Sequence, residues 1–150
     1  MTMFRSRIAL TTFSLIVLMA SSAWAEVTVE KAWVRATPSP GRATAGYAEI
    51  VNSGPVSDQL LGVHAASAEM TELHQSKSDG GMMTMQVIPV LEIPANGRVE
   101  LRPGDYHLMI MGLTRPLKVG DTLDLEFIFK SAGKQIVKAK VAPLAATAAP

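Results

Sequence analysis

The sequence predicts an all-β domain, an antiparallel β-sandwich or Greek-key barrel of about eight or nine short strands. Apolar residues recur mostly at every second position in short runs, as they do in half-buried strands. Each run ends at Gly, Pro, Asn or Asp, residues that favour turns. No window of about 11 residues shows an apolar stripe with helical spacing. Short strands at such regular intervals are typical of sandwiches and barrels.

The strands can be placed along the chain from this alternation. Val27, Val29 and Trp33 belong to a first strand, which ends at the Pro- and Gly-containing segment 37–41. A second strand covers 47–51 and is closed by the turn residues that follow it. The remaining predicted strands are 59–64, 69–75, 82–90, 98–101, 107–113, 122–129 and 135–141.

Residues 1–25 read as a cleaved secretory signal peptide. Arg5 and Arg7 precede an apolar run over 8–20, and Ala23 and Ala25 supply small residues at a cleavage site. The sequence therefore predicts a protein exported to the periplasm, with a β-domain over residues 26–142. The last residues, 143–150, are rich in Ala, Thr and Pro and carry no charge, so we expect a flexible tail.

The composition excludes several classes of protein. Removing the two leader arginines from 14 basic residues leaves 12 against 13 acidic ones, a net charge of −1. This balance argues against binding to nucleic acid, which needs a basic excess. The chain has no cysteine, which excludes iron–sulfur clusters, thiolate zinc sites, blue-copper sites and a lipid anchor on an N-terminal Cys. After the leader we expect no membrane insertion.

Methionine is concentrated in one part of the chain. After the leader, all six methionines lie between residues 70 and 111, together with His74 and His107; they are Met70, Met82, Met83, Met85, Met109 and Met111. On a strand, His107, Met109 and Met111 share one face, and Leu108 and Ile110 take the other. Packing of methionine in a core would account for this segment alone.

A second segment changes this interpretation. The residues 76–81 read as a hairpin connection between strands 69–75 and 82–90, which places His74 opposite the region 82–85. The register is open, so Met83 and Met85 compete for the position nearest His74, and Met82 takes the other face. Two His–Met pairs suggest a His2Met2 metal site. Soft, neutral thioethers suit Cu(I) better than zinc or hard cations.

The spacing of four of these residues resembles a known family signature. His74, Met85, His107 and Met109 follow the pattern H-x(10)-M-x(21)-H-x-M of the periplasmic copper chaperones called PCuAC. The resemblance extends over residues 27–142. It is also carried by the segments 32–36, 72–74, 93–95 and 106–113.

This resemblance implies a cupredoxin-like fold and one Cu(I) ion held by His74, Met85, His107 and Met109. It also implies delivery of copper to an acceptor protein, the copper site of cytochrome c oxidase or another oxidase assembly factor. A second copper site, which some relatives carry in a His- and Met-rich C-terminal extension, is not expected, because residues 143–150 contain neither residue type.

Two other functions remain open at this point. A copper-buffering or copper-resistance protein would use the same four ligands, so the sequence does not separate it from a carrier. A β-sandwich interaction domain without metal would use the methionines for packing. We do not expect an enzyme, since no cysteine nucleophile is present and no nucleophile-elbow context surrounds the serines.

Several nearby residues are expected to have ordinary structural roles. His64, Met83 and Met111 lie outside the signature, and Trp33 is expected in the core. Packing or support of a ligand is the favoured role of Met83 and Met111, although either could substitute as a ligand during exchange. The carboxylates of Glu72 and Asp105 could accept a hydrogen bond from an imidazole. Solvated positions are nevertheless the favoured prediction for both.

Overall fold

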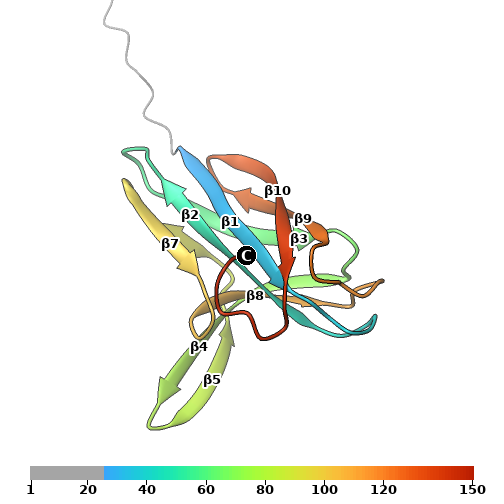
Figure 1. The fold of residues 1–150 in the computed structure, drawn as a ribbon. Helices are drawn as coiled ribbons and strands as arrows, with labels where there is room; N and C mark the ends of the chain where they lie inside the picture. Colours follow the sequence, from blue (N-terminus) through green and yellow to red (C-terminus); the bar gives the residue numbers. More distant parts are fainter. Residues whose placement is uncertain (1–25) are drawn as a thin grey trace, which may run out of the picture.

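In the computed structural model, which describes residues 26–150, every regular element of this part of the chain is a β-strand (Figure 1). The predicted signal peptide, residues 1–25, lies outside the described residues. Between residues 26 and 150 no helix has the length and apolar character needed to cross a membrane. The ten strands are β1 (Val27–Arg35), β2 (Thr44–Asn52), β3 (Asp58–Ala65), β4 (Met70–Asp79), β5 (Met82–Val87), β6 (Leu91–Ile93), β7 (Gly97–Leu101), β8 (Tyr106–Met111), β9 (Thr122–Phe129) and β10 (Gly133–Ala142).

The strands form one continuous sheet. They hydrogen-bond in the order β5-β4-β8-β2-β1-β10-β9-β3-β6, and β7 pairs with β2. The predicted all-β fold class is confirmed. One pairing differs from the antiparallel expectation, because the end of β1 runs parallel to β10, with Trp33 beside Lys140 and Arg35 beside Ala142. The sheet is therefore mixed.

The predicted strand over 82–90 is two strands. β5 ends at Val87 and pairs with β4, whereas β6 starts at Leu91 and pairs with β3 at the other end of the sheet order. Pro89 lies between them, and a proline has no N–H to donate to a strand partner. This division raises the nine predicted strands to the ten of the structure.

A single apolar core holds most of the sheet together. It takes inward-facing side chains from β1, β2, β3, β6, β7, β8, β9 and β10. On β8 these side chains are Leu108 and Ile110, and both are completely buried. Because side chains alternate along a strand, His107, Met109 and Met111 must point away from this core.

A smaller apolar cluster covers part of the opposite face. Trp33 and Tyr47 lie with ring centroids 4.4 Å apart and are almost fully buried, as predicted for Trp33. Ala146 of the C-terminal segment packs on this cluster, and its carbonyl oxygen accepts two hydrogen bonds from the Arg35 guanidinium at 3.0 and 3.2 Å. In Figure 1 this segment loops over β1. The flexibility of residues 143–150 stays a prediction.

The β4–β5 hairpin extends beyond the rest of the molecule (Figure 1). The side chains at the end of β4 and all six of β5 are exposed. The first half of β4 is different, because it pairs with β8 from Met70 to Gln75. One strand thus connects the packed body with a projecting hairpin.

Candidate metal centre

The β4–β8 register brings the two predicted histidine ligands together. His74 lies directly opposite His107, and Glu72 lies opposite Met109. The imidazole rings have centroids 5.8 Å apart and planes at 63°. With metal–nitrogen bonds of about 2.0 Å, two imidazoles on one ion have ring centres roughly 5–6 Å apart. The observed separation therefore suits a shared ion.

The β4–β5 register places Met85 diagonally beside His74. His74 pairs with Val87, and Met85 pairs with Ser76, so the prediction that His74 lies opposite region 82–85 was wrong by two residues. Since His74 and Ser76 share a face, Met85 lies on the face of His74, two residues closer to the hairpin turn than Val87. Met83 lies on the same face a further two residues toward the turn, opposite Ser78.

The hairpin turn is shorter than the predicted connection over 76–81. β4 continues to Asp79, and only Gly80 and Gly81 lie between the strands. Their φ angles are +56° and +84°, as a two-residue hairpin turn with two left-handed residues requires. Because β4 continues to Asp79, Met85 pairs with Ser76 and lies on the same face as the histidines.

His107 is held in one orientation by the backbone. Its side chain is buried, and its Nδ1 donates to the Asp105 carbonyl oxygen at 2.9 Å. A carbonyl oxygen only accepts, so the ring proton is on Nδ1 and the Nε2 lone pair is free. The same carbonyl accepts the backbone N–H of Ser76 at 3.2 Å, and this hydrogen bond ties the segment before β8 to β4. It is thus the backbone of Asp105, and not its carboxylate, that orients the ring.

His74 uses the other ring nitrogen for its hydrogen bond, and its partner is a side chain. Its Nε2 lies 2.8 Å from Oε2 of Glu72, and its Nδ1 is buried without a hydrogen-bond partner in the described part of the chain. Because a carboxylate accepts, the neutral ring carries its proton on Nε2 and leaves the Nδ1 lone pair unused. A buried acceptor without a partner costs free energy, which a bound metal ion would recover.

Glu72 therefore does not have the solvated position favoured from the sequence. Its side chain is one-third exposed and orients the imidazole two residues along the same strand. The signal for this contact was available, because residues at i and i+2 of a strand share a face.

The thioethers are more open to solvent than the imidazoles. Met109 is partly buried, whereas Met85 is 54% exposed and Met83 is 66% exposed. Among residues 26–150 no group of three His, Cys, Asp or Glu side chains has the arrangement of a metal site. The donors that the geometry collects here are two imidazole nitrogens and neighbouring thioether sulfurs.

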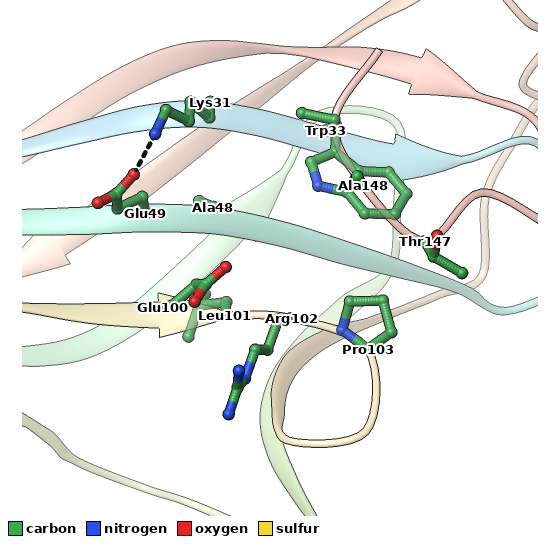
Figure 2. A pocket seen from close by; sticks show the side chains of 11 residues that line it. Lys31, Trp33, Ala48, Glu49, Glu100, Leu101, Arg102, Pro103, Thr147 and Ala148 are labelled. Atoms are coloured by element: carbon green, nitrogen blue, oxygen red, sulfur yellow. Dashed lines mark hydrogen bonds and ion pairs between the residues drawn. The ribbon is translucent and has the colours of Figure 1, made fainter.

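Other candidate residues lie elsewhere. His64 is on β3, where it is exposed and pairs with Glu126, and this strand carries none of the predicted ligands. A cavity of about 290 Å³ lies between the sheet and the C-terminal segment, with Trp33 on one side (Figure 2). The Lys31 ammonium donates to the Glu49 carboxylate there at 2.6 Å, and this hydrogen bond lowers the pKa of Glu49. No histidine or methionine lines this cavity.

Two solved structures have a similar fold. The chain is similar to the PCuAC domain titled "Copper-bound PCuAC domain from PmoF2", with 23% identity and a TM-score of 0.67, covering 81% of this chain and 96% of that one. It is also similar to the Deinococcus radiodurans protein titled "CuI-DR1885", with 32% identity and a TM-score of 0.64, covering 87% of each chain. The cupredoxin-like β fold is therefore confirmed.

Sequence comparisons agree with the structural ones. A protein named "Putative lipoprotein Lxx21020" of Leifsonia xyli subsp. xyli is 32% identical over 116 residues, which cover 77% of this chain and 69% of that protein. The family model described as "Putative lipoprotein LpqE-like" matches residues 27–141. The chain therefore belongs to the LpqE-like family of PCuAC-type proteins.

Proposed function

We propose that this protein is an exported copper chaperone that binds one Cu(I) ion through His74, Met85, His107 and Met109. The observation that carries the proposal is the buried, unpartnered Nδ1 of His74, which lies on the same sheet face as the other three residues. Copper-bound structures of relatives support the choice of metal. The two thioethers support the reduced ion, because soft sulfur donors favour Cu(I).

The two halves of this donor set suit ligand exchange. The imidazoles are held by Glu72 and by the Asp105 carbonyl, so they need little reorganisation to receive an ion. Met85 is exposed on a projecting hairpin, where a ligand of an incoming protein can replace it. Copper is then cargo: it passes between ligands stepwise, and no bond of the protein is made or broken. This is a binding function without catalysis.

The acceptor we propose is the copper site of cytochrome c oxidase or another oxidase assembly factor. The place of transfer is the periplasm, reached by a signal peptide over residues 1–25 that is cleaved near Ala25. Membership of a family described as lipoproteins supports export. A copper buffer using the same four ligands is the second candidate, and it differs from a carrier only in whether an acceptor takes the ion.

An anaerobic titration tests the binding proposal. The protein from residue 26 onward is mixed with Cu(I) and a chromophoric Cu(I) chelator, and competition for one equivalent is expected. X-ray absorption of the loaded protein is expected to show two nitrogen and two sulfur neighbours. An all-nitrogen shell, or no competition with the chelator, would contradict the ligand set.

Transfer separates the carrier from the buffer. The loaded protein is mixed with a metal-free, soluble copper-site domain of cytochrome c oxidase, and the two are separated by chromatography. A carrier loses its copper to this domain within minutes. If copper stays on the donor in the presence of excess acceptor, the buffer function is correct.

A further inference from the structure

We propose that Met70 and Met111 form a second binding place for a soft monovalent cation, made of thioethers and adjacent to the four-residue site. Met70 on β4 pairs directly with Met111 on β8. They lie on the outward face of the sheet, the face that carries His74, His107 and Met109. None of the ligands assigned above is needed to form this pair.

The strand geometry brings the two sulfurs within reach of one ion. Directly opposed residues of antiparallel strands have Cβ atoms about 4.5–5.5 Å apart. Metal–sulfur bonds are about 2.3 Å long, so two sulfurs on opposite sides of an ion are about 4.6 Å apart. The backbone register fixes the Cβ positions, and the flexible methionine side chains can make the remaining adjustment.

Core packing does not account for this pair. Met70 is 50% exposed, and Met111 is partly buried. The inward positions beside them are taken by Thr71 and Ile110, which face each other across the same strands. A single exposed methionine is ordinary, but two thioethers placed opposite each other beside a candidate copper site are a donor pair.

An acidic side chain lies at the end of the pair. Glu69 precedes Met70, and its backbone N–H donates to the Met111 carbonyl oxygen at 3.1 Å. Its side chain lies over Gly112, where an added Cβ would be 2.7 Å from the carboxylate Oε2. A carboxylate over Gly112, the residue after Met111, adds negative charge to this end of the strands and favours a cation there, and thioethers select a soft one.

Met109 connects the pair with the four-residue site. It is two residues from Met111 on the same face of β8, a distance of about 7 Å along a strand. An ion that leaves the histidines while still bound to Met109 can therefore pass to Met70 and Met111. This relay role rests on the function proposed above, whereas binding of a cation by the pair does not.

Silver(I), a soft monovalent ion that is not oxidised in air, is the probe for the test. Protein with ¹³C-labelled methionine methyl groups is titrated with Ag(I) and followed by NMR. The first equivalent is expected to shift the methyl signals of Met85 and Met109, and the second those of Met70 and Met111. In the Met70→Leu/Met111→Leu variant the second response is lost and the first is kept. Met82→Leu, an exposed substitution on the other hairpin face, is the control and keeps both.

A His74→Ala/His107→Ala variant separates this inference from the proposed function. If the Met70 and Met111 signals still shift with Ag(I), the thioether pair binds independently of the four-residue site. If several equivalents leave both signals unmoved in the wild type, the inference is wrong, even when the first site fills. Wild-type shifts decide the matter if a leucine variant fails to fold.

Discussion

The strands β8 and β5 supply ligands to one proposed site, yet their surroundings differ. On β8, Leu108 and Ile110 are completely buried, and His107 is fixed by a backbone carbonyl. On β5 every side chain is exposed, and β4 is its one strand partner among residues 26–150. This difference suits the proposed function, in which the protein binds an ion and then releases it to a partner. One half of the donor set is preorganised by the core, and the other half lies on a hairpin accessible to a partner.

The largest expected effect concerns stability, and it tests whether the two strands are anchored so differently. Leu108→Ala removes a completely buried side chain from β8 and is expected to lower the free energy of unfolding by about 2–5 kcal/mol. Val87→Ala changes a side chain of β5 that is 53% exposed, so a change below about 0.5 kcal/mol is expected. Urea unfolding measures both. Similar losses in the two variants would show that the hairpin is as tightly packed as the body.

The next effect concerns the preorganised half of the donor set. Loss of a hydrogen-bond partner of a metal ligand typically costs about 10–100-fold in affinity, so loss of the ligand His107 in His107→Ala is expected to cost more than about 100-fold in Cu(I) affinity. Competition with a chromophoric chelator measures the change. His64→Ala, an exposed histidine on β3, is the matched control and should bind Cu(I) as the wild type does.

Much of the fold could be predicted from the sequence because most strands have one buried face. The alternation over 122–129 and 108–111, for example, follows directly from burial at every second residue. The end of β4 could not be found this way, since Ser76 to Asp79 extend beyond the core and no face of them is buried. They read as a loop, although the pair Gly80-Gly81 was itself a signal for a two-residue turn.

The candidate site was predictable in its residues but not in its details. Side-chain alternation places His107 and Met109 on one face, and the family resemblance selects Met85 over Met83. The parallel pairing of β1 with β10 joins residues far apart in the chain, and no local pattern reports it. The orientation of each imidazole depends on its hydrogen-bond acceptor, one a carboxylate and one a backbone carbonyl. Such a choice is made by tertiary contacts.

A smaller effect is expected from the group that orients His74. Glu72→Ala removes the acceptor of the Nε2 proton and is expected to lower Cu(I) affinity by about tenfold. Glu72→Gln keeps an acceptor oxygen and should restore most of this loss. Asp105→Asn is the contrasting case, because His107 uses the backbone carbonyl of Asp105, and its effect should be below about threefold. Equal losses in Glu72→Ala and Asp105→Asn would contradict the two modes of orientation.

The smallest expected effect concerns Met85, the exposed ligand on the projecting hairpin. Met83 lies on the same hairpin face as Met85, two residues further along β5 from His74, so it can replace Met85 as a ligand. Met85→Leu alone is therefore expected to cost less than about tenfold in Cu(I) affinity, while Met83→Leu/Met85→Leu costs more than the sum of the two single changes. Met82→Leu/Met85→Leu should behave as Met85→Leu, because Met82 lies on the other face. Competition with the chromophoric chelator measures the Cu(I) affinity of these three variants and of Met83→Leu. Strictly additive losses at 83 and 85 would mean that the projecting hairpin supplies one fixed ligand, and that release depends on the body of the protein instead.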